Sequence, residues 1–347
     1  MFQFLRWVLT RRAEAGGDAG HASFADCAHH ERFAPCGTDL APSLADRSLE
    51  LAAQNRLDEA LEEVARALRF DEHSARALFA RGAIRVAAGQ FEEAVFDLTE
   101  ALARNYAAAE VFAQRGYAWL SLGRYRDGLA DFTKAIRLDP NDFGSRCNRA
   151  VCLQRLERVD ELSGDLEELL AMTEHLALPS EEALPEDDEE AEEAEVAEME
   201  RARQIRCWTL MIRGSLRRQR GEFAEELKDY LEAIRWQPSD AEACNNAAWV
   251  LATSPDDSLR DGERAEALAW RACELSNWAV SSYIETLAAA LAERGDFENA
   301  VKRQIEAERD MSAEERLTFG DLKERYRKRL PLRVAIPADG TGDDARP

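Results

Sequence analysis

Residues 89–102 read GQFEEAVFDLTEAL, and residues 123–140 read GRYRDGLADFTKAIRLDP. The two segments share a pattern of residue types, and their first glycines lie 34 residues apart. Small residues recur with the same step in three further series: Ala60, Ala94 and Gly128; Ala67, Ala101 and Ala135; Ser48, Gly82 and Gly116. Residues 221–238 and 295–310 carry the pattern further along the chain. A fixed spacing of this length is the signature of a repeat protein.

Within one repeat the apolar residues follow the period of a helix, with a break in the middle. Gly89 separates two apolar series, which are Leu78, Ile84 and Val86 before it and Phe91, Val95 and Leu98 after it. Such a glycine ends one helix, and a second helix begins directly behind it. A single pair of helices would leave an apolar face in water, so neighbouring pairs must stack. The pattern predicts stacked helix pairs, and a four-helix bundle with fortuitous spacing is the alternative.

The spacing and residue types resemble those of the tetratricopeptide repeat family, in particular its bacterial members. The family's unit is a pair of antiparallel helices that small side chains allow to approach closely. In this chain the small positions fall on Gly82, Ala94, Ala101, Gly116, Gly128, Ala135, Gly214, Ala233, Ala288, Ala300 and Ala307, and the closing prolines are Pro140 and Pro238. Seven units begin near residues 41, 75, 109, 143, 207, 241 and 281. The resemblance implies an all-α fold, a right-handed α-solenoid of about seven helix-turn-helix repeats.

An acidic segment interrupts the repeats. The fourth and fifth unit starts lie 64 residues apart, which leaves an insert at residues 177–206. Residues 181–200 hold twelve acidic side chains and no basic one. The segment is interpreted as a flexible linker or as an electrostatic tether for a basic partner. Residues 191–208 are rich in helix formers, so we expect them to lengthen the first helix of the fifth unit.

This organisation predicts six regions along the chain. They are an N-terminal extension (1–40), units one to four (41–176), the acidic insert (177–206), units five to seven (207–316), a basic capping helix (317–333) and a flexible tail (334–347). Leu322, Tyr326 and Leu330 are expected to share one face of the capping helix. The sixth unit departs from the pattern, because about five extra residues around Pro255 lengthen the turn between its helices.

The charge balance and the cysteines limit the class of protein. The chain has 347 residues with 45 Lys and Arg against 68 Asp and Glu, a net charge of −23. So acidic a chain repels phosphate backbones, which excludes duplex nucleic acid as a partner. No uncharged apolar run approaches the ~18 residues that a transmembrane segment needs. Seven cysteines without a C-x-x-C pair indicate reduced thiols, which predicts a cytoplasmic protein.

The sequence offers no recognisable catalytic or metal site. It lacks the nucleophile, metalloprotease, phosphate-loop and dinucleotide motifs, so we expect neither enzymatic activity nor a cofactor. His21, Cys27, His29, His30 and Cys36 lie close together, but their spacing differs from that of structural zinc sites. No metal is therefore expected, and a metal-dependent or enzyme-accessory protein built on this cluster is kept as an alternative.

In the tetratricopeptide repeat family, the first helix of each unit lines a concave groove. The inward positions carried onto this chain are Phe79, Ala83, Tyr117, Leu120, Cys147 and Val151 before the insert, and Trp208, Met211, Ser215, Asn245 and Trp249 after it. They include no lysine, which argues against the capture of a carboxylate terminus as in some family members. Aromatic and apolar anchors suit a peptide that presents apolar side chains.

The resemblance therefore implies a non-enzymatic protein-protein interaction scaffold or adaptor, whose partner the sequence does not identify. The alternative is a structural subunit that associates with copies of itself, and the sequence leaves the oligomeric state open. The apolar residues 1–9, MFQFLRWVL, fit a cap on the first unit, a membrane-surface segment or a peptide that docks in the groove.

Overall fold

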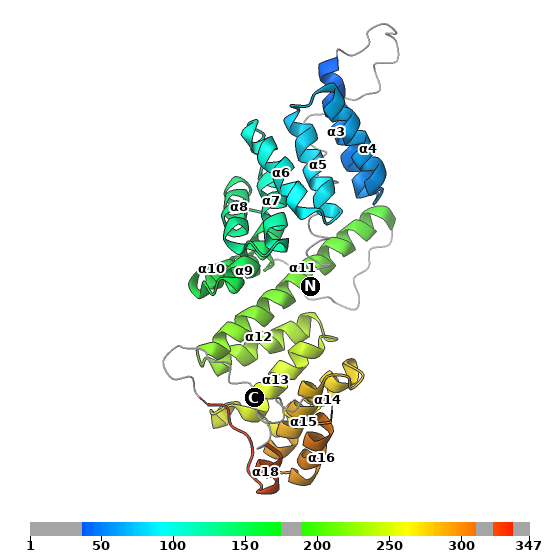
Figure 1. The fold of residues 1–347 in the computed structure, drawn as a ribbon. Coiled ribbons are helices and arrows are strands. Elements are labelled where there is room, and N and C mark those ends of the chain that lie inside the picture. Colours follow the sequence, from blue (N-terminus) through cyan, green and yellow to red (C-terminus); the bar gives the residue numbers. More distant parts are fainter. Residues whose placement is uncertain (1–36, 175–188, 310–321, 336–347) are drawn as a thin grey trace. The chain divides into compact units, whose positions relative to one another are not determined.

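The computed structural model describes residues 37–174, 189–309 and 322–335, and all regular structure in these ranges is helical (Figure 1). These ranges contain fifteen α-helices and one short 3-10 helix, and no strand. The all-α class predicted from the repeat is confirmed. Within the same ranges no helix is long and apolar enough to cross a membrane, and no three potential metal ligands gather. The His and Cys cluster and residues 1–9 lie outside them.

Fourteen of the helices follow one another in seven pairs. The pairs are α3 (Gly37–Ala53) and α4 (Leu57–Phe70); α5 (Ala75–Ala87) and α6 (Phe91–Ala103); α7 (Ala109–Ser121) and α8 (Tyr125–Leu138); α9 (Phe143–Arg155) and α10 (Val159–Met172); α11 (Glu189–Gln219) and α12 (Phe223–Trp236); α13 (Ala241–Thr253) and α14 (Gly262–Leu275), with the 3-10 helix η2 (Asp257–Leu259) between them; α15 (Ser281–Glu293) and α16 (Phe297–Ala307). Five first helices begin at residues 75, 109, 143, 241 and 281, where the spacing places unit starts. Helix α11 has 31 residues, so the expected lengthening of this helix is confirmed.

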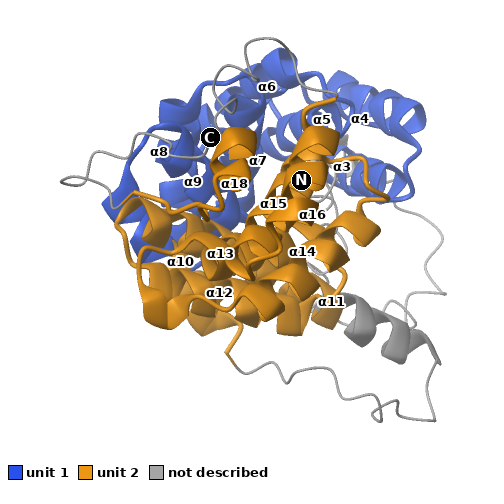
Figure 2. Ribbon diagram, turned by 90° about the horizontal axis from the view of Figure 1, so that it is seen from below, with its two compact units in different colours: residues 1–165 blue, residues 166–347 orange. Residues whose placement is uncertain are grey.

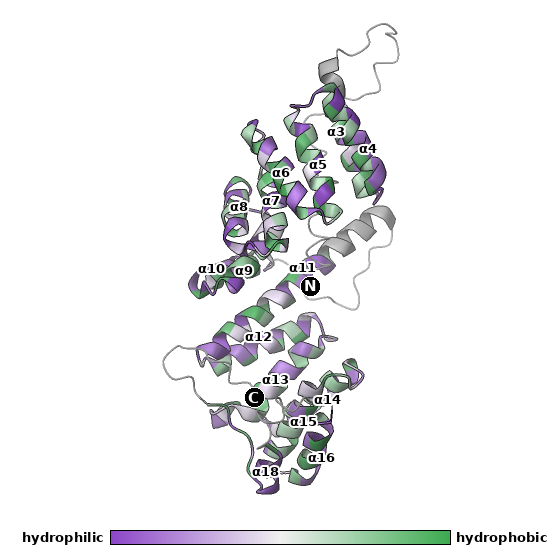
Figure 3. Cartoon of the chain, in the orientation of Figure 1, coloured by the Kyte–Doolittle hydropathy of each residue, from purple (hydrophilic) through white to green (hydrophobic). Residues whose placement is uncertain are grey.

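The chain divides into two compact units, Met1–Asp165 and Leu166–Pro347 (Figure 2). The boundary falls inside α10 and not in the acidic segment. In the first unit α6 packs on α7 and α8 packs on α9, and in the second α12 packs on α13 and α14 on α15. Successive pairs therefore stack within each unit. The helices carry both hydrophilic and hydrophobic residues (Figure 3), as such stacking requires.

Close approach within the pairs depends on small residues at fixed positions. Seven alanines are fully buried there: Ala94, Ala101, Ala135, Ala233, Ala288, Ala300 and Ala307. A Cβ atom added to Gly82 would lie 2.7 Å from Cγ of Leu98, and one added to Gly116 would lie 2.9 Å from Cε1 of Phe132. Both distances are well below the ~3.5 Å at which carbon atoms attract each other. Gly82 and Gly116 thus let the facing helix approach, and larger residues there would hold it away.

In four of the pairs a glycine with a positive φ reverses the chain in the short turn between the two helices. In the pair α5 and α6, Gly89 adopts a φ of 76°, which side chains disfavour. The N–H of Gln90 then donates to the carbonyl oxygen of Arg85 at 2.8 Å, which closes the end of α5. Pro140 and Pro238 follow the ends of α8 and α12, where they are exposed.

The turn between α13 and α14 is longer than the others and is ordered by its own side chains. It comprises residues 254–261. The Asp256 carboxylate accepts hydrogen bonds from the N–H of Ser258 at 2.9 Å and from its hydroxyl at 2.8 Å. The Arg260 guanidinium pairs with Glu293 of α15 at 2.9 Å. The inserted residues therefore form a fixed loop, which we call the inserted loop.

The C-terminal helix α18 is shorter than the predicted capping helix. It spans Leu322–Arg327, with Leu322 and Tyr326 buried. Leu330 follows the helix and is 49% exposed, so the prediction that it shares their face is wrong. Pro331 explains the difference, because a proline lacks the N–H and clashes with the preceding helical turn.

Candidate binding groove and its supporting ion pairs

The inward residues of the first compact unit lie mostly in its core. Four of them are only 2% to 8% exposed: Phe79, Tyr117, Leu120 and Cys147. Ala83 and Val151 are partly exposed. The Tyr117 ring packs edge-on against Phe91, with the ring centroids 6.2 Å apart. The four buried side chains therefore contribute to packing and present little surface to a ligand.

The residues of the second compact unit that are predicted to face inward leave more of their apolar surface exposed to solvent. Trp208 and Met211 of α11 and Trp249 of α13 are partly exposed, and Ser215 is exposed. Asn245 of α13 is 5% exposed. Met211 packs against two core clusters, and Trp249 packs against one of the two. We call these five residues, which the repeat pattern predicts to face inward, the inner face of α11 and α13, together with Arg218, which has the next such position on α11. Apolar atoms of this set are open to solvent.

Three polar atoms of the inner face have no hydrogen-bond partner among the residues that the structure describes. They are Nε1 of Trp208, Nη2 of Arg218 and Oδ1 of Asn245. Buried polar atoms in proteins are nearly always bonded, so an unbonded one indicates a place that water or a ligand completes. A peptide backbone offers both the donors and the acceptors that these atoms lack.

A buried carboxylate that the apolar pattern does not single out holds Arg218 in place. Arg218 donates through Nε to Oε1 of Glu226 at 2.6 Å, and Glu226 is fully buried in α12. In most other pairs the same repeat position carries a small residue, as at Ala94 and Gly128. A carboxylate is tolerated in this interior because a guanidinium neutralises it. The pair fixes the Arg218 side chain on the inner face.

A series of buried ion pairs joins the two helices of four pairs. In each, an arginine of the first helix uses two nitrogens to bond an aspartate of the second: Arg81 with Asp97, Arg115 with Asp131, Arg149 with Asp165, and Arg213 with Asp229. The four aspartates are 0% to 3% exposed. The arginines and the aspartates recur with the steps of the repeat, 34 residues and then 64 across the insert. This spacing of arginines and aspartates is present in the sequence, but a search for small and apolar positions does not detect it.

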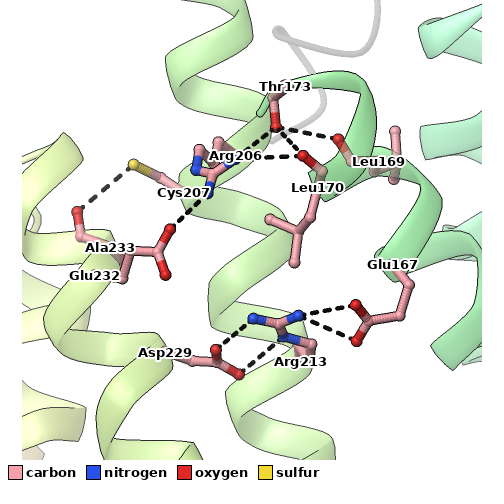
Figure 4. A network of polar contacts seen from close by, with 10 residues as sticks. All are labelled: Glu167, Leu169, Leu170, Thr173, Arg206, Cys207, Arg213, Asp229, Glu232 and Ala233. Carbon is pink, nitrogen blue, oxygen red and sulfur yellow. Dashed lines mark hydrogen bonds and ion pairs between the residues drawn. The ribbon is translucent and has the colours of Figure 1, made fainter. Parts of the chain in front are cut away.

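Two arginines clamp α11 between α10 and α12 (Figure 4). Arg213 bonds Asp229 of α12 through Nη2 at 2.7 Å and Glu167 of α10 through Nη1 at 3.0 Å. Arg206 bonds Glu232 of α12 at 2.6 Å and, at 3.3 Å, a carbonyl oxygen in the last turn of α10. Helix α11 is therefore bonded to the C-terminal part of α10, although the acidic segment lies between α10 and these arginines in the sequence.

Burial and charge together set the ionisation of this clamp. Burial raises the pKa of the Asp229 carboxyl above its ordinary value, although Arg213 and Arg217 oppose the shift. Burial alone would lower the pKa of the Arg213 guanidinium, but the bonds and charges of Asp229 and Glu167 outweigh it and raise that pKa. Arg213 therefore stays ionised at neutral pH and holds both carboxylates.

The five cysteines of the described ranges are buried free thiols. Burial raises the pKa of Cys147, Cys152 and Cys207 to about 12. We expect iodoacetamide to leave these three unmodified in the native chain, because at about pH 8 only ~1 in 10,000 such thiols is ionised. The same reagent should label them in urea, as mass spectrometry of the peptides would show. Labelling of the native chain at the rate of a free cysteine would contradict their burial.

Residues 109–142, which include α7 and α8, match the family model described as tetratricopeptide repeat. The chain also contains seven helix pairs in succession. Helices α7 and α8 thus form a tetratricopeptide repeat within the chain.

Solved tetratricopeptide repeat proteins resemble the chain at low sequence identity. One from Parabacteroides merdae is 16% identical, with a TM-score of 0.46, over 83% of this chain and 99% of that chain. The C-terminal part of one from Cytophaga hutchinsonii is 11% identical, with a TM-score of 0.49, over 86% and 96%. YrrB, whose structure is described as having an unusual peptide-binding site, is 17% identical, with a TM-score of 0.34, over 68% and 87%. No curated protein matches the sequence.

Proposed function

We propose that this chain is a non-enzymatic scaffold that binds a peptide segment of another protein on the inner face of α11 and α13. One observation carries the proposal: partly exposed apolar side chains and unpartnered polar atoms lie on the same helices. Aromatic and apolar anchors supply most of the energy of an interface, and a few polar atoms fix the orientation of the ligand. The inner face holds both kinds of group.

The chemistry of the inner face defines the kind of peptide. Trp208, Met211 and Trp249 favour apolar side chains on the ligand. The charge of Arg218 is balanced by Glu226, so the face sets no requirement for an acidic ligand. We expect the ligand to be a segment with at least two apolar side chains, and its binding does not require a free carboxylate terminus.

Two further assignments belong to this proposal. We place the scaffold in the cytoplasm, because its described cysteines are free thiols, which persist in reducing compartments. The acidic residues that precede α11 serve as a linker between helix pairs, since their like charges favour a solvated chain.

A peptide selection with one matched control tests the binding face. Peptides are selected from a random display library against the full-length chain, and the Kd of the best one is measured by calorimetry. We expect Trp249→Ala to weaken binding roughly 30-fold, the loss of about 2 kcal/mol that is usual for an aromatic anchor. Trp270→Ala should leave the Kd unchanged, because Trp270 is an exposed tryptophan of α14.

The proposal fails if Trp249→Ala binds the peptide as tightly as the parent chain does, while circular dichroism shows that both are folded. Light scattering over a range of concentrations separates the scaffold from the alternative of a structural subunit. A mass that grows with concentration would favour self-association.

A further inference from the structure

The segment after α18 runs across the ends of first helices, from the seventh pair toward earlier ones. Helix α18 itself packs on α16 of the seventh pair. Arg333 pairs with Glu293, the last residue of α15, at 2.7 Å. The next residue, Val334, donates its N–H to the carbonyl oxygen of Thr253, the last residue of α13, at 2.9 Å. The red end of the described chain in Figure 1 thus reaches the sixth pair.

The next feature in this direction is a pocket between the fifth and sixth pairs. Its volume is about 550 Å³, and its apolar walls are Phe223 and Ala224 at the start of α12 and Pro255 and Leu259 of the inserted loop. This volume is in the range of sites that hold small ligands or side chains. Pro255 lies two residues beyond Thr253, the residue that binds Val334. The pocket therefore lies close to where the described C-terminal segment ends.

The inserted loop is the reason that the pocket exists. In the other described pairs three residues connect the first helix to the second, so no chain extends toward the preceding pair. In the sixth pair the loop supplies Pro255 and Leu259 as one wall. The bond from Ser258 to Asp256 within the loop and the ion pair of Arg260 with Glu293 hold that wall in place.

We propose that Ile336 and Pro337, the residues that follow the described segment in sequence, fill this pocket. Ile336 follows Val334 by two residues, and Pro255 follows Thr253 by two. Two residues of extended chain span about 7 Å, so an extended chain after Val334 would bring Ile336 close to Pro255. The side chain of Ile336 matches the apolar walls. Pro337 adds apolar surface and has no N–H that burial would leave unbonded.

The direction of the chain supports this occupant. Residues of α18 contact the seventh pair and Val334 contacts the sixth. The described segment thus leads from the seventh pair toward the fifth, whose turn and second helix form the other wall of the pocket. The carboxylates of Glu222, Glu225 and Asp256 border the pocket and repel Asp339. The contact therefore ends near Ala338. Filled in this way, the pocket fastens one segment to three successive pairs.

Photocrosslinking tests the occupant directly in the full-length chain. The crosslinking residue p-benzoylphenylalanine replaces Ile336, and mass spectrometry locates the products after irradiation. We expect crosslinks to residues 221–225 or 255–259 of the same chain. The same residue in place of Asp344 is the control and should not label these segments. Crosslinks from position 336 to a second copy, or to the inner face of α11 and α13, would overturn the proposal.

Hydrogen exchange gives a second measurement that does not depend on a bulky substitution. Two shortened chains are compared with the full-length chain, one ending at Ala335 and the other at Ala338. We expect the amides of residues 256–260 to exchange roughly tenfold faster in the chain that ends at Ala335, because the loop loses an apolar contact. The chain that ends at Ala338 should exchange like the full-length chain. Equal exchange in all three would overturn the proposal.

Discussion

Replacement of Arg115 by methionine is expected to lower the free energy of unfolding by about 3 to 5 kcal/mol. Arg115 donates to the carboxylate of Asp131 through Nε at 2.7 Å and Nη2 at 2.8 Å, and Asp131 is 3% exposed. Methionine keeps much of the volume of the side chain but removes its charge. The carboxylate is then left buried without a counter-ion, and this costs more than the ion pair contributes when it is intact.

Arg81→Met is the matched control for this effect. Asp97 is bound by Arg81 at 2.7 Å and also by Arg85 at 2.6 Å, so one positive charge remains after the change. We expect a clearly smaller loss than for Arg115→Met, as measured by urea unfolding followed by circular dichroism. Equal losses in the two variants would show that a stranded carboxylate is not the cause.

A double variant separates the cost of the stranded charge from the value of the pair. When Asp131→Leu is combined with Arg115→Met, the buried charge disappears and apolar side chains take its place. Replacing a whole buried ion pair is often close to neutral. We therefore expect the double variant to recover most of the stability that Arg115→Met loses.

Gly214→Ala is expected to destabilise the chain by roughly 1 to 3 kcal/mol, as overpacking of a core does. The added Cβ atom would lie 2.6 Å from Cε1 of Tyr230. Tyr230 is 1% exposed, so its ring has no free space into which it can move. The two helices α11 and α12 must then separate, although alanine is the better helix former.

Gly164→Ala is the control and should change stability in the opposite direction. Gly164 lies within α10, and no atom lies within 4 Å of the Cβ that would be added. Alanine is favoured over glycine in a helix by about 1 kcal/mol, so we expect a gain of this order in thermal unfolding. A loss in both variants would show that the backbone, and not the approach of the helices, limits these positions.

The helix pairs could be predicted from the sequence because their determinants lie within one repeat. Gly89 ends one helix, and the apolar series on either side of it already has the helical period. Leu330 shows the limit of such reasoning. Its spacing from Tyr326 fits a helix, but the proline that follows it decides the local backbone.

The ion pairs were present in the sequence, but their meaning required the structure. Arg81 and Asp97 are 16 residues apart, and this separation brings two side chains together only after the length of both helices and the turn is known. Glu226 is a similar case. A glutamate at a repeat position that usually holds a small residue departs from the pattern, and only the structure shows that Arg218 binds it.

The exposure of the groove residues could not be predicted either. Tyr117 is predicted to face inward, yet it is buried against Phe91 of a different helix. Trp249 occupies a comparable position and is partly exposed. The repeat determines which face of a helix a residue lies on, whereas the side chains of neighbouring helices determine whether that residue is covered.

The clamp that Arg206 and Arg213 place on α10 affects how long the connection between α10 and α11 can become. Because the clamp fixes both ends of the connection between α10 and α11, its length enters the stability only as the entropy of closing a loop. That entropy grows slowly, and doubling a loop costs only about 0.6 kcal/mol. Evolution can therefore lengthen this connection, and an engineer can graft a whole domain into it, without shifting the register of the helices on either side.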